Sequence, residues 1–384
     1  MPANLTPPAR GRRLLVNRGA HRAGSLVLDT RVVHDDLEQR KSQHLDLVQR
    51  PEVEPDGSDS LFGCVRLIHR ALPELSLDQI DLSLELCGKT LKAPFMIVGM
   101  TGGTERAGQI NRDLAAIAQE EGVAFGVGSM RILFDQPELL PTFATRSARP
   151  PLLFANLGAQ QLVQRGPSAA LHLIELLAAD GICIHLNAAQ ELVQADGDRD
   201  FRGCLDAIGE LARELGPRLV VKETGCGIGP DVARLLQAKG VRCIDVSGRG
   251  GTSWTRVEQL RAKTDDARAL GELLSDWGLP TAACVIAARA AAPGLQIIAS
   301  GGMRSGLDAA RAIAVGADAA GFALPLVRAH QEGGAEAAQR VLRGAIAALR
   351  ATCLLTGARN LLSLRRTSPV LLDPLRSWVE QLAR

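Results

Sequence analysis

The sequence predicts an α/β fold in which eight parallel strands close into a (β/α)8 TIM barrel with an N-terminal extension. Eight short apolar runs follow one another from residue 94 onward. They are apolar almost throughout, as expected of strands buried on both faces of a parallel sheet. Helical patterns separate most of them, and this alternation favours a parallel sheet with right-handed crossovers. Eight such units over about 260 residues match the size of this barrel, and an open doubly wound sheet is the alternative.

The expected elements can be placed along the chain by their composition. Strands are expected where apolar runs are bounded by glycine or proline, at residues 94–100, 123–128, 151–157, 181–187, 218–224, 241–248, 295–302 and 317–323. Helices are expected where stretches rich in alanine, leucine and arginine lie between them, at 107–121, 168–179, 202–215, 229–239, 305–316 and 333–352. Five arginines and no acid precede Asp29. This predicts a flexible basic tail over residues 1–36, with an organellar transit peptide as the alternative.

The overall composition excludes several classes of protein. Lys plus Arg total 44 and Asp plus Glu total 42, so the formal net charge is +2, which argues against nucleic-acid or membrane partners. No uncharged apolar run approaches the roughly 20 residues of a membrane-spanning helix. The eight cysteines include no C-x-x-C pair, so we expect buried thiols in a cytoplasmic protein rather than a zinc site.

Polar side chains and glycines follow the expected strands, and this placement predicts where the functional site lies. In a closed barrel the carboxyl ends of all strands meet at one face, which carries the active site in this fold. The segments concerned are residues 100–103, 128–131, 156, 185–187, 222–223, 247–252 and 301–304.

The two glycine-containing segments 301–302 and 321–324 follow the seventh and eighth expected strands. Loops at these two places in a barrel often bind phosphate through backbone N–H groups and a helix N-terminus. Glycine suits this role because a Cβ atom would hold the phosphate away. A plain tight turn is the alternative.

Two charged residues at strand ends predict ligands. Lys222 closes an otherwise apolar strand, so its ammonium group needs a counter-charge or a ligand. A flavin would supply one, because negative charge gathers near N1 and O2 on reduction, and a salt bridge to Glu223 or Asp245 is the alternative. Glu191 follows an imidazole and two amides, and such a carboxylate can hold a divalent cation that grips a diphosphate. A surface glutamate is the alternative.

Eight segments carry a family resemblance: RKSQHL, APFMIVGMTGGT, GVGSMR, ANLGAQQL, HLNAAQELVQADGDRDF, VVKETGCGI, IDVSGRGGTSW and ASGGMRSG. Together they resemble type 2 isopentenyl diphosphate isomerase, the FMN-dependent family, over about residues 40–324. HLNxxQE followed by GDRDF, and SGRGGTSW, are the most specific of these patterns. Three motifs depart from the family: Met130 stands where Gln is usual, Gln43 stands where an acid is common, and Ala188–Ala189 follow HLN where proline or a similar residue is usual.

The resemblance implies a barrel that binds FMN at its mouth and isopentenyl diphosphate above the flavin ring. The residues that match FMN contacts are Met100, Thr101, Gly102, Ser129, Asn156, Lys222, Ser247, Thr252, Gly301, Gly302, Arg304, Ala323 and Leu324. Those that match substrate contacts are Arg40, Lys41, His44, Ser129, Arg131 and Gln190. Glu191 matches the Mg²⁺ ligand, and the resemblance gives Gln190, His185 and Asn187 as the catalytic residues, which also match diphosphate and pocket contacts.

The reaction implied by the resemblance is a 1,3-allylic proton shift that turns isopentenyl diphosphate into dimethylallyl diphosphate, with NADPH needed only to reduce FMN. The expected division of the chain places a substrate-capping segment at residues 37–93, the FMN-binding barrel at 94–360 and a C-terminal tail at 361–384. A homo-oligomer, tetramer or octamer, is also expected. The alternatives are an FMN-dependent oxidoreductase on the same barrel, a non-catalytic flavin- or phosphate-binding protein, and an isomerase relative that acts on another prenyl diphosphate.

Overall fold

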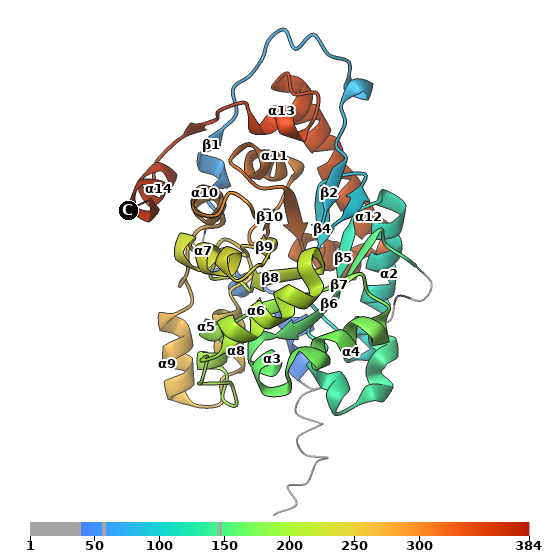
Figure 1. The fold of residues 1–384 in the computed structure, drawn as a ribbon, viewed down its shortest axis with the longest axis vertical. Coiled ribbons are helices and arrows are strands. Elements are labelled where there is room, and N and C mark those ends of the chain that lie inside the picture. Colours follow the sequence, from blue (N-terminus) through green and yellow to red (C-terminus); the bar gives the residue numbers. More distant parts are fainter. Residues whose placement is uncertain (1–39, 56–58, 144, 146–147, 384) are drawn as a thin grey trace, which may run out of the picture.

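The computed structural model describes residues 40–55, 59–143, 145 and 148–383. The basic tail predicted over residues 1–36 lies outside the described residues. Eight parallel strands form a closed barrel in the order β10-β11-β4-β5-β6-β7-β8-β9, which confirms the predicted TIM barrel and excludes the open sheet (Figure 1). The strands are β4 (Phe95–Ile97), β5 (Ala124–Gly126), β6 (Leu152–Gly158), β7 (Gly181–Leu186), β8 (Leu219–Glu223), β9 (Cys243–Asp245), β10 (Gln296–Ala299) and β11 (Ala319–Phe322).

Helices connect the strands and cover the outside of the barrel (Figure 1). They are α2 (Glu105–Glu121), α3 (Ala159–Arg165), α4 (Pro167–Leu177), α5 (Ala188–Val193), α6 (Cys204–Leu215), α7 (Pro230–Ala238), α8 (Trp254–Arg261), α9 (Asp265–Leu273), α10 (Thr281–Ala291), α11 (Gly306–Ala314), α12 (Leu324–Leu355), α13 (Leu361–Arg365) and α14 (Leu375–Leu382). Each of the six predicted helical patterns falls on one of them, whereas no prediction covered α3, α5, α8, α9, α10, α13 and α14. In place of a helix, β5 and β6 are joined through the short 3₁₀ turns η4 (Arg131–Phe134) and η5 (Pro137–Thr142).

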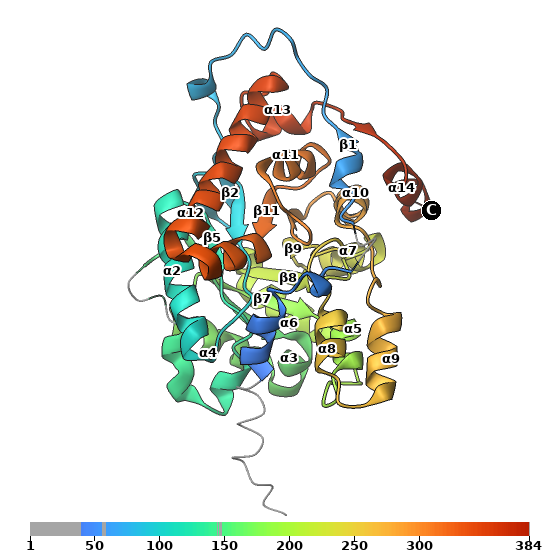
Figure 2. The ribbon, with the colours of Figure 1, turned by 180° about the vertical axis from the view of Figure 1, so that it is seen from behind.

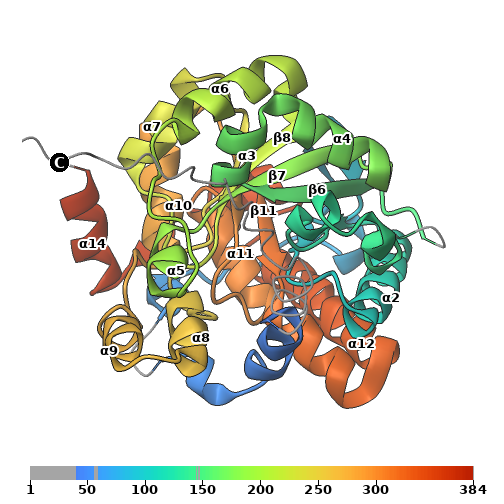
Figure 3. The ribbon, with the colours of Figure 1, turned by 90° about the horizontal axis from the view of Figure 1, so that it is seen from below.

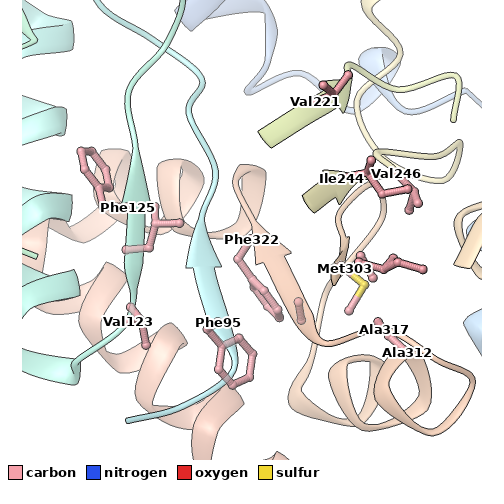
Figure 4. Packing of buried hydrophobic residues seen from close by; sticks show 14 of the residues in the cluster. Phe95, Val123, Phe125, Val221, Ile244, Val246, Met303, Ala312, Ala317 and Phe322 are labelled. Carbon is pink, nitrogen blue, oxygen red and sulfur yellow. The ribbon is translucent and has the colours of Figure 1, made fainter. Parts of the chain in front are cut away.

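The strands separate two hydrophobic cores because successive residues of a strand point to opposite faces. Met96 and Val98 belong to the core inside the barrel, whereas Phe95 and Ile97 belong to the larger core between the barrel and its helices. Figure 4 shows this outer core, in which the rings of Phe95 and Phe322 meet edge to face with centroids 5.4 Å apart. The layered packing fixes the strands rigidly and so fixes the residues that follow them.

A short hairpin closes the end of the barrel where the strands begin. It consists of β2 (Leu84–Leu86) and β3 (Lys89–Leu91), joined by Cys87 and Gly88, which both have positive φ as a tight hairpin turn requires. Leu86 and Leu91 are fully buried in the inner core. The side chain of Gln296, the first residue of β10, donates to Glu85 O at 2.8 Å and accepts from Cys87 N at 2.9 Å.

The N-terminal segment predicted to cap the substrate site therefore contacts both ends of the barrel. Its first part, residues 40–54, lies at the mouth, where residues 40–47 are helical and 51–53 form the 3₁₀ turn η1. Figure 2 shows this dark-blue segment beside α8. Val53 is fully buried, and its carbonyl oxygen accepts a hydrogen bond from Ser253 N at 2.8 Å. Glu54 pairs with Arg304 and with Arg328, the latter at 2.6 Å.

Residues 361–383, the described part of the predicted C-terminal tail, pack on the fold. Strand β12 (Val370–Leu371) pairs antiparallel with β1 (Val65–Arg66), which precedes the barrel. Leu364 is fully buried, and the Arg365 guanidinium lies 2.8 Å from the Asp318 carboxylate. Figure 1 shows this red segment running from α13 past β1 to α14. Among the helices of the described residues, none combines the length and the apolar run needed to cross a bilayer.

Candidate active site

One cavity lies at the mouth of the barrel, lined by residues that follow all eight strands and by the N-terminal helix. Figure 3 shows that helix, in dark blue, between α8 and α12. The structure brings every predicted site residue into the lining of this cavity. From the helix and the first four strands these are Arg40, Lys41, His44, Met100, Thr101, Gly102, Ser129, Arg131, Asn156, His185, Asn187, Gln190 and Glu191. From the last four strands they are Lys222, Ser247, Thr252, Gly301, Gly302, Arg304, Ala323 and Leu324.

The loops after β9 and β10 approach so closely that only glycine fits between them. Gly301 and Gly302 have φ of 94° and 75°. A Cβ atom on Gly301 would collide with Gly248 O, and one on Gly302 would collide with Gly250 O. This packing leaves backbone facing the cavity in place of side chains.

Free backbone donors gather at this part of the cavity. Within the described residues, the N–H groups of Gly302, Ala323 and Leu324 have no hydrogen-bond partner. Leu324 begins α12, and no side chain caps this helix. Uncapped N–H groups at a helix N-terminus attract anions, since they combine free donors with the positive end of the helix dipole. The region is therefore a candidate phosphate site, as the sequence predicted.

A cluster of cations forms a second anion-binding region of the cavity. The Lys41 ammonium donates to Ser129 O at 3.1 Å and lies 4.9 Å from the centre of the Phe143 ring. Burial, reinforced by the charges of Arg40 and Arg131, lowers the pKa of Lys41 to about 7. Three cationic side chains lie together here, and among the described residues no carboxylate pairs with Lys41. This arrangement favours a multiply charged anion as their partner.

His185 is neutral in this cavity. Burial, followed by the charges of Lys222 and Arg131, lowers the pKa of His185 to about 3. The Asn156 amide donates to Val127 O at 3.1 Å, so its Oδ1 atom accepts from His185 Nδ1 at 2.8 Å. The proton is thereby fixed on Nδ1, and Nε2 keeps its lone pair.

Glu258 is the principal residue of the site that the sequence did not reveal. It is buried on α8 and accepts hydrogen bonds from His44 Nε2 at 3.0 Å, Gln190 Nε2 at 3.1 Å and Arg261 Nη1 at 2.5 Å. Burial favours the neutral acid, but the hydrogen bonds from His44 and Gln190 and the charge of Arg261 lower the pKa of Glu258 to about 2. The ionised carboxylate holds the Gln190 amide so that its Oε1 atom is left for the cavity. Only the Glu258–Arg261 spacing of three residues could have indicated it.

Glu191 and Asn187 offer oxygen atoms suited to a hard cation. Glu191 accepts from Asn187 Nδ2 and from Asp198 N, both at 2.8 Å. The Asn187 Oδ1 atom is buried without a hydrogen-bond partner in the described part of the chain. No cluster of three or more His, Cys, Asp or Glu residues suited to a metal occurs among the described residues. A magnesium ion here would therefore be coordinated by the Glu191 carboxylate, the Asn187 amide oxygen, water molecules and oxygens of a bound ligand. Mg²⁺ commonly takes only one or two protein carboxylates and keeps several waters.

Two predicted features are clarified by the structure. Lys222 has no carboxylate within 4.0 Å in the described part of the chain, and its ammonium group donates to the backbone oxygen of Glu223. The alternative of a direct salt bridge is thus not observed. Met130, where the family usually has Gln, is fully buried in the outer core and does not line the cavity. Its side chain is therefore a packing residue and faces away from any ligand of the cavity.

The fold and the cavity define a TIM-barrel protein with a candidate anion-binding site at the barrel mouth, and comparison with known proteins agrees with this fold. A family model described as FMN-dependent dehydrogenase matches residues 186–370. Among solved structures, a putative lactate oxidase of Pediococcus acidilactici aligns with a TM-score of 0.63 and 17% identity, over 88% of this chain and 94% of that chain. A mandelate oxidase aligns with a TM-score of 0.59 and 18% identity, over 88% and 98%. At these identities the likeness shows the fold alone.

Curated relatives identify the family more closely. Isopentenyl-diphosphate delta-isomerase of Nostoc sp. is 43% identical over 332 residues, 86% of this chain and 95% of the relative. The protein of the same name from Xanthobacter autotrophicus is 45% identical over 338 residues, 87% and 98%. The chain belongs to the isopentenyl-diphosphate delta-isomerase family and is an enzyme of that family. The predicted family resemblance is thereby confirmed.

Proposed function

We propose that this enzyme converts isopentenyl diphosphate to dimethylallyl diphosphate by a reversible 1,3-allylic proton shift, with reduced FMN as the acid and base and Mg²⁺ on the diphosphate. The observation that carries the proposal is a single cavity with two anion-binding regions, one of free backbone N–H groups and one of buried cations. Two phosphate-bearing molecules, a cofactor and a substrate, account for both regions.

The first region fits the phosphate group of FMN. Gly302, Ala323 and Leu324 supply donors, and Arg304 supplies a charge at the rim of the cavity. Lys222 and Asn156 lie on strand ends across the barrel, where they can face the edge of a flavin ring. When bound and reduced, FMN supplies an electron-rich ring whose N5 atom can hold and deliver a proton. NADPH would serve only to reduce it, since the isomerisation has no net redox change.

The second region fits the diphosphate of the substrate. Arg40, Lys41 and Arg131 would hold its oxygens directly, and Glu191 with Asn187 would hold a Mg²⁺ ion that shares them. Anchoring one end of a short substrate fixes its double bond in one place, and such positioning supplies several kcal/mol of rate enhancement.

The remaining side chains of the cavity suit a carbocation-like transition state. Gln190 is held by Glu258 with its amide oxygen free, and because an amide is a poor acid, we assign it an orienting role near the double bond. His185 is neutral and adds no positive charge beside a developing cation. Leu45, Val48 and Trp254 line the same cavity with apolar surface, which suits a prenyl chain. The N-terminal helix lines the cavity with residues 40, 41, 44 and 45 and would exclude water from the cation.

The proposal is tested by one assay. The purified enzyme is incubated under anaerobic conditions with FMN, a catalytic amount of NADPH to reduce it, Mg²⁺ and isopentenyl diphosphate, and the formation of dimethylallyl diphosphate and the consumption of NADPH are both followed. We expect many moles of product for each mole of NADPH consumed. NADPH consumption that keeps pace with product, or flavin binding without product, would refute isomerisation and favour an oxidoreductase or another prenyl diphosphate.

A further inference from the structure

A row of polar residues crosses three adjacent strands of the barrel just beneath the cavity. His185 on β7 is the register partner of Lys222 on β8, and Lys222 is the register partner of Asp245 on β9. Two residues earlier on the same strands, Cys183, Val220 and Cys243 belong to the inner core. Because the side-chain period of a strand is two, all three residues of the row point into the barrel.

Asp245 has an incomplete set of hydrogen bonds. Its side chain is 1% exposed. Oδ1 accepts from Ser300 Oγ at 2.6 Å and from Ser247 N at 3.2 Å. Oδ2 is buried and has no hydrogen-bond partner in the described part of the chain. A buried carboxylate oxygen with no donor is costly unless a neighbouring positive charge stabilises it.

Among the described residues, Lys222 has too few hydrogen-bond acceptors for its ammonium group. It is 5% exposed and donates to a single protein acceptor, the Glu223 backbone oxygen, although an ammonium group has three N–H donors. Its other neighbours do not balance its charge. His185 is neutral, and burial raises the pKa of the Cys183 thiol. The Glu223 carboxylate lies on the opposite face of β8 and accepts from the backbone N–H groups of Thr224 and Gly225. Burial also raises the pKa of Asp245, and the charge of Lys222 is the strongest influence in the opposite direction.

We infer that Asp245, although it makes no direct salt bridge to Lys222, is the buried counter-charge of that residue across the strand pair and thereby sets the net charge that the floor of the cavity presents to the flavin ring. Lys222 lines the cavity and Asp245 does not, so Asp245 acts through Lys222 and is a positioning residue. With both groups charged, the pair is neutral overall and its positive end faces the cavity. The part of this inference that concerns flavin rests on the proposed function, whereas the charge pairing itself does not.

The pairing is tested first in the FMN-free protein by a double-mutant cycle. Thermal unfolding is measured for Lys222→Gln, Asp245→Asn and the double variant. Each single variant leaves one uncompensated buried polar site, so we expect the double variant to lose less stability than the sum of the two single losses. An Asp245→Asn chain that folds only in the Lys222→Gln background also supports the inference. Additive losses, or three variants equally unable to fold, overturn it.

An exposed pair provides the matched control. Lys239 and Asp206 lie 2.7 Å apart on the surface with side chains 39% and 76% exposed. The same cycle on this pair is expected to be additive, because exposed ion pairs contribute little.

The consequence for flavin is tested by the reduction potential of the FMN-bound enzyme. Asp245→Asn leaves Lys222 uncompensated, so the variant is expected to favour reduced FMN at least tenfold more than the wild type, an upward shift of about 30 mV for a two-electron couple. Lys222→Gln is expected to lower the potential. An unchanged potential in Asp245→Asn with FMN bound overturns the inference. A wild-type protein that binds no FMN refutes the proposed function instead, and the unfolding cycle then decides the pairing.

Discussion

The buried ammonium group of Lys41 makes substrate binding depend on pH. In the ligand-free enzyme its pKa falls from 10.5 to about 7 because of burial and the charges of Arg40 and Arg131. At 1.36 kcal/mol per pKa unit, this corresponds to about 5 kcal/mol against the charged form. A bound diphosphate adds negative charge against the ammonium group and moves its pKa back toward the usual value. Binding therefore takes up a proton between about pH 7 and the usual pKa of a lysine, about 10.5.

The direction and size of the effect follow from this linkage. A group whose pKa rises on binding favours the complex at low pH, and affinity falls by up to tenfold per pH unit above the pKa of the free form. Between pH 7.5 and 9.0 the dissociation constant of isopentenyl diphosphate should rise by up to about 30-fold. The phosphate ester itself is fully ionised in this range, since its second pKa is about 6. Burial lowers the pKa values of His44 and His185, so neither titrates there.

Titration calorimetry with isopentenyl diphosphate measures this directly, with the flavin left oxidised so that no turnover occurs. Proton uptake is obtained from two buffers of different ionisation enthalpy at each pH. Lys41→Met is the matched control, because it keeps an unbranched side chain that is one atom shorter and removes the titrating group. We expect its binding to be weaker at pH 7.5 and nearly independent of pH. Equal proton uptake in the two proteins would refute this account of Lys41.

Four further substitutions test the other parts of the site. Glu191→Gln should remove the dependence on Mg²⁺ and most activity while FMN stays bound; full activity would exclude Glu191 from the mechanism. Lys222→Ala should lose FMN on gel filtration, and an unchanged flavin content would contradict the assigned contact. Glu258→Gln removes the charged acceptor of the Gln190 hydrogen bond, worth about 1.5–3 kcal/mol. We expect kcat/KM to fall about 10- to 150-fold at normal flavin content. An undiminished rate would show that Gln190 does not need this hydrogen bond. Met130→Gln buries an unpaired amide, so we expect the free energy of unfolding to fall by about 1–3 kcal/mol. A changed preference among prenyl diphosphates in this variant would mean that residue 130 does face the substrate.

The barrel and the position of its site could be predicted because both follow from simple patterns. Strands buried on both faces are continuous apolar runs, and any polar residue that ends such a run must lie at the rim of the barrel. Asn156, His185 and Lys222 are of this kind, and all three line the cavity. The family resemblance added the residues that no pattern marks, such as Arg40 and Lys41 in the N-terminal helix.

The parts that could not be predicted depend on contacts distant in sequence. Glu258 lies on a helix, where a glutamate beside an arginine looks like an ordinary surface pair, and only the fold brings His44 and Gln190 to it. The hairpin of residues 84–91 has no local feature that assigns it to the closed end of the barrel. The 32-residue helix α12 extends beyond the predicted range 333–352 on both sides. Its backbone is non-helical at Gly333 and Gly334, so the helical periodicity is interrupted at the residue where the predicted helix begins.

The pairing of β1 with β12 has a consequence for how the polypeptide matures during synthesis. Residues 65–66 leave the ribosome early, but their partners at 370–371 follow only after every barrel strand has been made. Until then the edge of β1 and the surface that receives α13 have no partner, and they are sites that a chaperone could recognise. The pairing of β1 with β12 can therefore form only after the whole barrel has been translated. A nascent chain interrupted before residue 370 would differ from the finished enzyme because its β1 edge stays unpaired.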